Sequence, residues 1–200
     1  MDDRQREKIQ KRLEEESRQS GMRISRVQME KILEALEKKE EGIPLKESLG
    51  FSAELLQSIY EFACRLGQGG EYETAYYAYH LLLQVDDPND VRYLQGKATA
   101  SFMLQYYQEA INLFLACYMR EPKNLGHLWY AIEASKEQGS DLVTMGLLKT
   151  FLENSEGISG YDADRERGKL MYERLQQKLN ELLTLAKDSE ALVKGVEAKE

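Results

Sequence analysis

The sequence predicts an all-α protein built from successive helical hairpins, and three observations support this. Apolar residues recur at spacings of three and four along most of the chain, as they do on one face of an α-helix. Glycine and proline interrupt this pattern at short intervals, where helices are expected to end. The pattern also repeats, because Ala75 and Ala110 are 35 residues apart and Pro88 and Pro122 are 34 apart.

Three segments carry the repeat: residues 56–87, 91–121 and 125–154. Two helices in each period of about 34 residues are typical of tetratricopeptide repeats, which stack into a short superhelix. The turn after the first helix keeps an aromatic residue and an alanine in the same relative places in the first two segments. The predicted fold is therefore three tetratricopeptide-like helix-turn-helix repeats, with a further helix at each end.

Packing between the two helices of a hairpin explains the residues that recur. A small side chain allows close approach of the helices, and Ala75 and Ala110 supply it in the first two repeats. A large residue four positions after the alanine, and another three positions further on, lie on the same helical face. These are Tyr79 and Leu82 in the first repeat, and Phe114 and Cys117 in the second. In the third repeat, Thr144 takes the place of the alanine, followed by Leu148 and Phe151.

The chain divides into five predicted parts. Residues 1–22 are a charged, flexible arm, and residues 23–50 form an amphipathic helix with a turn that is a possible dimer contact, although this helix could instead fold back on the first repeat. Residues 51–157 hold the three repeats, and Ser52 stands where a helix cap is expected. Residues 158–187 form a helix with a heptad-like stripe of barely more than two heptads. A free coiled coil needs about three to four, so we expect a capping helix laid on the last repeat, and residues 188–200 are a tail.

Composition excludes several classes of function. A net charge of −8 offers no basic face for nucleic acid. The N-terminal residues are charged and no stretch approaches about 18 apolar residues, so we expect neither a secretory signal nor membrane insertion, and predict a cytoplasmic location. The two cysteines, Cys64 and Cys117, suggest buried thiols, with neither a disulfide nor a zinc site.

Catalytic motifs are also missing from the sequence. His80 and His127, the only histidines, do not stand at metal-ligand spacing. The run of glycines at 67–70 lacks the Lys-Ser/Thr of a phosphate-binding loop and follows a helix. The carboxylates are adjacent on charged segments, which is typical of a solvated surface. We therefore predict no enzyme activity and no cofactor or metal.

A concave groove is the predicted binding site, because the first helix of each tetratricopeptide repeat lines the inner surface. Counting along those helices gives the expected inner wall: Tyr60, Cys64, Gln68, Arg92, Gln95, Thr99, Phe102, Met103, Trp129, Glu133 and Lys136. Exposed aromatic side chains there would form an apolar strip of the kind that binds a partner. The polar ones could satisfy the main chain of an extended peptide. Alternatively, some of these aromatic residues pack only between helices, as we expect of the tyrosines at 72, 76, 77 and 79.

Three stretches of the sequence resemble a known family: residues 42–52 (GIPLKESLGFS), residues 59–63 (IYEFA) and residues 70–75 (GEYETA). In this order they are similar to the SycD/LcrH-type chaperones of bacterial type III secretion, the class that serves translocator proteins. The resemblance covers residues 24–151. Gly67 and Gly69, the charged arm and the long last helix depart from the family's pattern.

This resemblance implies a chaperone of the bacterial cytoplasm that holds an export substrate, a translocator or a gatekeeper protein, and keeps it soluble. It also implies that the chain hydrolyses no ATP, and it supports a homodimer through the N-terminal helix. The alternative is a tetratricopeptide scaffold that assembles partners already folded.

Overall fold

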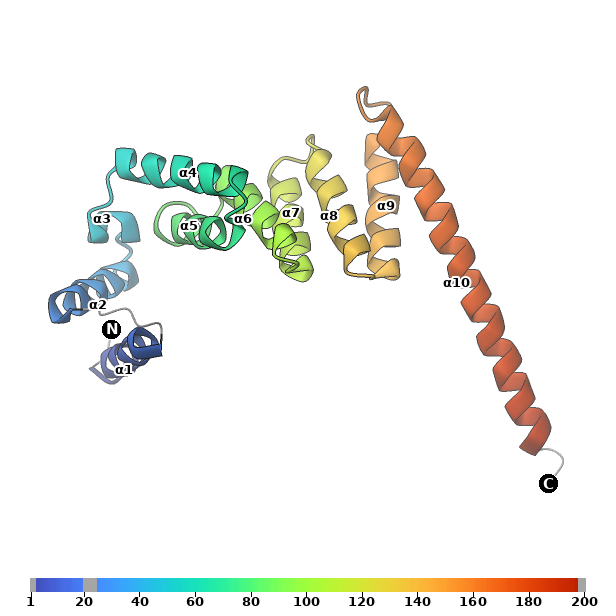
Figure 1. The fold of residues 1–200 in the computed structure, drawn as a ribbon, viewed down its shortest axis with the longest axis horizontal. Coiled ribbons are helices and arrows are strands. Elements are labelled where there is room, and N and C mark those ends of the chain that lie inside the picture. Colours follow the sequence, from blue (N-terminus) through green and yellow to red (C-terminus); the bar gives the residue numbers. More distant parts are fainter. Residues whose placement is uncertain (1–2, 20–24, 198–200) are drawn as a thin grey trace. The chain divides into compact units, whose positions relative to one another are not determined.

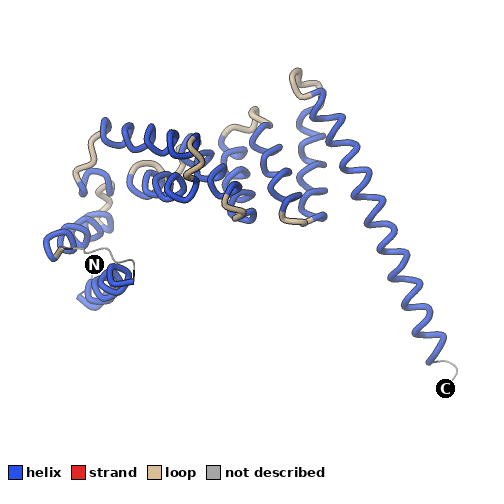
Figure 2. The backbone as a smooth tube through the Cα atoms, viewed as in Figure 1, coloured by secondary structure: helices blue, strands red, loops and turns tan. Residues whose placement is uncertain are grey.

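The computed structural model describes residues 3–19 and 25–197, and all regular secondary structure in these ranges is helical (Figures 1 and 2). This confirms the all-α prediction. The chain forms two compact units, Met1–Ala100 and Ser101–Glu200. Within the described ranges, no helix is long and apolar enough to cross a membrane.

The first unit begins with three helices that precede the predicted repeats. They are α1 (Asp3–Gln19), α2 (Arg26–Glu40) and the short α3 (Leu45–Leu49). Ser25 caps α2, since its hydroxyl accepts a hydrogen bond from the amide of Gln28 while the Gln28 side chain bonds back to Ser25. The helix ends before Gly42, whose φ of 87° is the left-handed conformation that glycine adopts most easily.

The first helical hairpin consists of α4 (Ala53–Gln68) and α5 (Tyr72–Val85), and is followed by α6 (Val91–Met103). The Ser52 hydroxyl caps α4 by accepting a hydrogen bond from the Leu55 amide, as predicted. Ala75 has no exposed surface, which confirms that a small residue lies where the two helices meet. Tyr79 and Leu82 are buried beside it, in agreement with the packing argument.

The second unit contains the end of α6, then α7 (Tyr107–Arg120), α8 (Gly126–Glu137), α9 (Asp141–Ser155) and α10 (Asp162–Glu197). Its core is formed by Leu125, Leu128, Ile132, Leu148 and Phe151. Thr144 is also buried, and its hydroxyl lies 2.8 Å from that of Ser135 on α8. The third hairpin therefore replaces the small-residue contact of the others with a buried polar pair.

The two ends of the chain differ from the prediction. Residues 3–19, expected to be an arm without a helix, form α1, which is held to α2 by Arg6 bonded to Glu30 and Glu37 at 2.7 and 2.5 Å. The predicted boundary at residues 22–23 lies outside the described residues. The last helix was expected to end at Lys187, but α10 continues to Glu197, because no proline interrupts this part of the sequence. The final three residues of the predicted tail lie outside the described ranges.

Candidate functional site

A cavity of about 320 Å³ lies between α4, α5 and α6 in the first unit. Most of its wall is apolar, and several of the residues that line it are glycine or alanine. We call it the apolar pocket; it is lined by Cys64, Gly67, Gln68, Tyr72, Ala75, Tyr79, Gly96, Thr99 and Ala100. Its size and apolar wall suit an aliphatic or aromatic side chain, and the amide of Gln68 and the hydroxyl of Thr99 can bond to the chain that carries it.

The shape of the apolar pocket depends on Gly96. A Cβ atom at this position would lie 2.3 Å from the ring of Tyr79, so the ring occupies space that only glycine leaves open. The Tyr79 hydroxyl in turn donates a hydrogen bond of 3.3 Å to Sγ of Cys64 on α4. Burial, and then this bond to Cys64, raise the pKa of Tyr79, which keeps its hydroxyl protonated at neutral pH.

Tyr60 lies between the apolar pocket and a second cavity. Its ring contacts Tyr79 of the pocket wall at a centroid distance of 6.3 Å and Tyr93 on α6 at 5.6 Å. The guanidinium of Arg92 lies over the rings of both Tyr60 and Tyr93, at 5.3 and 5.4 Å from their centroids. Such cation–π contacts restrict the orientation of the arginine head group.

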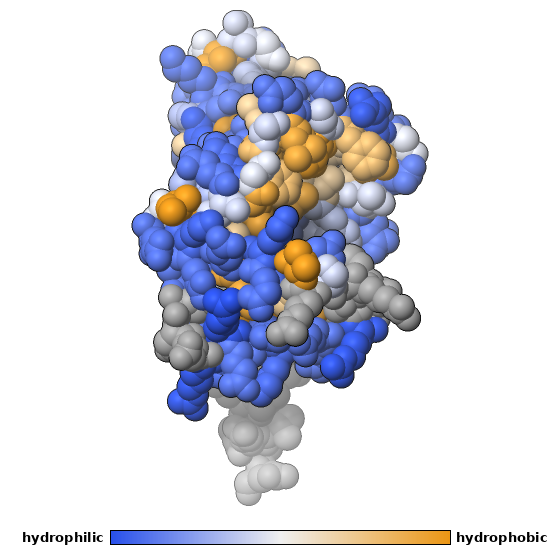
Figure 3. Space-filling view, turned by 90° about the vertical axis from the view of Figure 1, so that its left-hand side faces the viewer, coloured by the Kyte–Doolittle hydropathy of each residue, from blue (hydrophilic) through white to orange (hydrophobic). Residues whose placement is uncertain are grey.

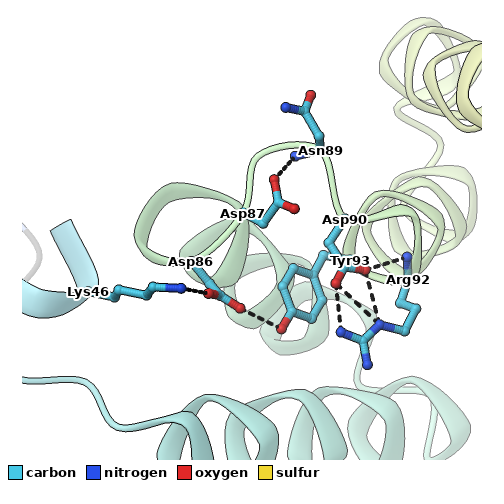
Figure 4. A network of polar contacts seen from close by, with 7 residues as sticks. All are labelled: Lys46, Asp86, Asp87, Asn89, Asp90, Arg92 and Tyr93. Carbon is cyan, nitrogen blue, oxygen red and sulfur yellow. Dashed lines mark hydrogen bonds and ion pairs between the residues drawn. The ribbon is translucent and has the colours of Figure 1, made fainter. Parts of the chain in front are cut away.

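The second cavity, of about 270 Å³, is polar. We call it the polar cavity; it is lined by Lys46, Glu47, Phe51, Ala53, Leu56, Gln57, Asp86, Arg92 and Tyr93. Figure 4 shows the network of polar contacts to which several of its residues belong. Asp86 accepts hydrogen bonds from Nζ of Lys46 at 2.9 Å and from the hydroxyl of Tyr93 at 3.0 Å. Asp90 accepts from Nε of Arg92 at 3.1 Å and from its Nη2 at 2.6 Å. The network links α3 to the turn between α5 and α6.

The charges of the polar cavity hold one another in their ionised forms. The hydrogen bond from Arg92 lowers the pKa of Asp90, and the same bond raises the pKa of Arg92. The bond to Asp86 raises the pKa of Lys46. Burial, and then hydrogen bonding to Asp86, raise the pKa of Tyr93 to about 12, so it acts as a donor at neutral pH.

In the second unit, predicted inner-wall residues gather around the start of α10. Trp129 packs against Phe151, with ring centroids 5.0 Å apart, and the guanidinium of Arg167 lies 5.3 Å from the Trp129 centroid. Glu133 pairs with Arg167 at 2.9 Å and with Lys136 at 2.7 Å. Trp129 is therefore part of the packing between α8, α9 and α10 as well as a candidate groove residue.

The structure groups most of the predicted groove residues in three places. Tyr60 contacts Arg92, and Cys64, Gln68 and Thr99 line the apolar pocket. Trp129 and Glu133 contact Arg167, and Lys136 pairs with Glu133. Gln95, Phe102 and Met103 lie outside these groups: Gln95 is exposed, Phe102 packs against Tyr107 at 5.8 Å between ring centroids, and Met103 is 46% exposed. That all these residues bind one partner stays a prediction.

Sequence reasoning missed part of the site. Tyr79 was expected to pack only in the core, but it is both buried and part of the pocket wall. Gly96 and Arg167 were not considered, although a glycine in the middle of a predicted helix is a signal of close packing. The ion pair of Lys46 with Asp86 joins residues 40 positions apart, and neither motif nor periodicity indicates it.

Comparison with solved structures identifies proteins of similar fold. SycD of Yersinia enterocolitica, in complex with a peptide of the translocator YopD, matches with a TM-score of 0.55 and 21% identity over 64% of this chain and 96% of its own. A chain of a type III secretion complex from Aeromonas hydrophila matches with a TM-score of 0.58 and 16% identity over 73% of this chain and 97% of its own. PcrH from Pseudomonas aeruginosa matches with a TM-score of 0.52 and 17% identity over 63% of this chain and 95% of its own.

The chain has the SycD fold. At these identities the likeness concerns the fold alone, and it agrees with the resemblance seen in the sequence. No family model and no curated protein matches the sequence. Among the described residues, no group of His, Cys, Asp and Glu side chains could hold a metal ion.

Proposed function

We propose that this protein is a type III secretion chaperone that binds an extended segment of an export substrate, a translocator or a gatekeeper, and keeps it soluble. The observation that carries the proposal is the apolar pocket between α4 and α6, the helices predicted to form the inner wall. The similarity to SycD bound to a YopD peptide supports it. We further propose that the protein acts in the bacterial cytoplasm and has no enzyme activity.

Binding would use two kinds of contact. An apolar side chain of the substrate enters the pocket and removes apolar surface from water, at about 25 cal/mol per Å². The exposed side chains of Gln68 and Thr99 meet the unpaired main-chain groups of the extended segment. A chaperone of this kind protects the segment from aggregation because its apolar residues are covered until export.

Filling the apolar pocket tests this mechanism. A Cβ at Gly67 meets no atom within 4 Å, so Gly67→Leu adds a side chain to the pocket wall without a clash at its first carbon. We expect this variant to lose most of its affinity for the substrate segment in isothermal titration calorimetry. Gly146→Leu on α9 is the matched control, since a Cβ there is also free of contacts within 4 Å and lies outside the pocket. Equal loss in both variants would contradict the pocket assignment.

Cys64 offers a second test without mutation. Its thiol is half-buried in the pocket wall, whereas Cys117 has no exposed surface and burial raises the pKa of its thiol to about 11. N-ethylmaleimide at pH 7.5 is expected to modify Cys64 and leave Cys117 unmodified, because thiolate and access control the rate. Bound substrate should slow the modification of Cys64, as measured by mass spectrometry of intact protein. Modification at an unchanged rate would place the substrate elsewhere.

The alternative function is a scaffold that assembles folded partners. Co-expression distinguishes the two functions. A chaperone makes an otherwise insoluble substrate soluble, whereas a scaffold binds partners that are stable without it. Pull-down from the native cytosol followed by mass spectrometry identifies which protein to co-express.

A homodimer through the N-terminal helix is part of the same proposal. Val27 on α2 is 68% exposed, and Phe62 on α4 is 49% exposed. Figure 3 shows a face of the molecule on which apolar side chains gather between polar ones. Sedimentation of a variant lacking residues 1–40 tests the helix: an unchanged oligomeric state would exclude it as the dimer contact.

A further inference from the structure

The two cationic side chains of the polar cavity, Lys46 and Arg92, keep hydrogen-bond donors that are not used within the protein. Both oxygens of Asp86 accept bonds from within the protein, and those of Asp90 bond to Arg92. Among the described residues, Nη1 of Arg92 has no hydrogen-bond partner, and Nζ of Lys46 donates only to Asp86. A ligand that supplies acceptor oxygens would therefore complete this cavity.

The Arg92 guanidinium is presented in a fixed orientation. Asp90 bonds to the edge formed by Nε and Nη2, and the rings of Tyr60 and Tyr93 lie against the planar group. This leaves the Nη1 end free, on a side chain that is 55% exposed. A carboxylate suits this end because arginine and carboxylate form charge-assisted hydrogen bonds in a planar geometry.

We propose that the polar cavity binds an acidic side chain, aspartate or glutamate, of the same segment whose apolar residue enters the apolar pocket. The proposal rests on the proposed function and gives its substrate a chemical pattern. Arg92 is the principal donor and Lys46 the second. Tyr60 separates the two subsites, since its ring contacts Tyr79 on one side and Tyr93 on the other.

The distance between the subsites sets the spacing of the two substrate residues. At 1.5 Å per residue, the cavities are about 9 Å apart along α6 and about 16 Å apart along α4. An extended chain rises about 3.3 Å per residue, so three to five residues span this distance. The expected substrate pattern is an apolar and an acidic residue separated by that many positions.

Glu47 allows the role of charge in the polar cavity to be tested by a second substitution. It also lines the polar cavity and is exposed, so its carboxylate repels an incoming acidic side chain. Replacing it by glutamine removes the repulsion and keeps the size of the side chain. Binding of an acidic peptide should therefore become tighter in Glu47→Gln and weaker in Arg92→Gln.

The experiment uses synthetic twelve-residue Gly/Ser peptides that contain one leucine and one aspartate three, four or five positions away on either side. Each has a partner with asparagine in place of the aspartate. Titration of the full chain is followed by ¹H–¹⁵N NMR, which detects weak binding. The backbone amides of Gly96 and Thr99 report on the apolar pocket, and the Nε–H of Arg92 reports on the polar cavity.

We expect one spacing at which the aspartate peptide binds at least fivefold more tightly than its asparagine partner and shifts the Arg92 Nε–H signal. This ratio should fall to about one in Arg92→Gln, rise in Glu47→Gln, and decrease with added salt. The spectrum itself shows whether each variant remains folded, and Arg92→Lys, which keeps the charge but loses the planar head group, should retain part of the preference.

The outcomes separate this proposal from the one on which it rests. Peptides that shift Gly96 and Thr99 equally well with aspartate or asparagine would overturn the acidic subsite and leave the chaperone groove intact. An aspartate preference that persists in Arg92→Gln would also overturn it. Peptides that shift neither pocket at any spacing would count against both.

Discussion

At the scale of single residues, the contact between Gly96 and Tyr79 controls the apolar pocket. In Gly96→Ala the new methyl group would meet the Tyr79 ring at 2.3 Å, and the ring cannot stay where it is. We expect the free energy of unfolding to fall by about 1 to 3 kcal/mol, the usual cost of overpacking a core. Urea denaturation followed by far-ultraviolet circular dichroism measures this.

Gly146→Ala on α9 is the control for that substitution. Nothing lies within 4 Å of the added Cβ, and alanine favours a helix over glycine by about 1 kcal/mol. This variant should therefore be as stable as the original protein or more so. Destabilisation in both would mean that the ring of Tyr79 is not the cause.

Asp90 gives the polar network a dependence on pH. Arg92 lowers the pKa of this carboxyl in the folded protein below its value of about 3.9 in the unfolded chain. A lowered folded pKa stabilises the protein above the unfolded value, and this contribution is lost as the pH falls through the folded pKa. The stability difference between the original protein and Asp90→Asn should therefore be larger at pH 5.5 than at pH 2.5, measured by urea denaturation. Asparagine keeps a side-chain oxygen that can accept the hydrogen bond from the Arg92 amide. An equal stability difference at the two pH values would contradict the stabilising role of ionised Asp90.

Residue roles could be predicted from the sequence where they follow from helical periodicity. Ala75, Ala110, Phe114 and Cys117 are buried as the repeat required. The polar cavity was not predictable in this way, because Lys46 meets Asp86 only through the folding of α3 against the turn after α5. An ion pair between two residues far apart in the sequence produces no repeating pattern that could reveal it.

At the scale of elements, α10 uses one end of its apolar stripe for packing. Leu175 packs against the core of the second unit, whereas Leu185, further along the same helix, is 64% exposed. Leu175→Ala should lower the free energy of unfolding by about 1 to 2 kcal/mol, less than for a fully buried leucine. Leu185→Ala should change it by less than about 0.5 kcal/mol. The fluorescence of Trp129, the single tryptophan, reports the transition, and equal effects would contradict the assigned contact.

Helix boundaries were predicted best inside the repeats and worst at the ends of the chain. The turns between α4 and α5 and between α8 and α9 contain glycines in the left-handed conformation, Gly70 and Gly139, which the sequence signals directly. The helix α1 was not predicted, because Ile9 and Leu13 are too few to indicate an apolar face. Its contact with α2 instead uses Arg6, a polar anchor that periodicity does not detect.

At the scale of the whole molecule, a bound substrate should stabilise the fold. A ligand that binds only the folded state adds about 2.7 kcal/mol at a concentration of 100 times its dissociation constant. We expect the free energy of unfolding, measured by urea denaturation, to rise by that amount with the identified substrate segment. It should stay unchanged with a scrambled peptide. A midpoint unaffected by a saturating segment would contradict binding to the folded state.

The fold class of the whole chain was predictable because the repeat of helical hairpins shows in the spacing of small and large residues along the sequence. The substrate was not, since binding depends on the chemistry of a few exposed side chains. Tyr60 and Arg92 were chosen as inner-wall residues by counting along helices, and the structure brings them into contact. What counting could not show is the cavity on either side of Tyr60.

The fit of Tyr79 over Gly96 also constrains how this sequence can change over evolution. Any larger residue at position 96 requires a smaller one at position 79, and a smaller residue at 79 would leave Cys64 without its hydroxyl partner. The three positions should therefore vary together among descendants of this protein, with single replacements selected against and paired ones tolerated.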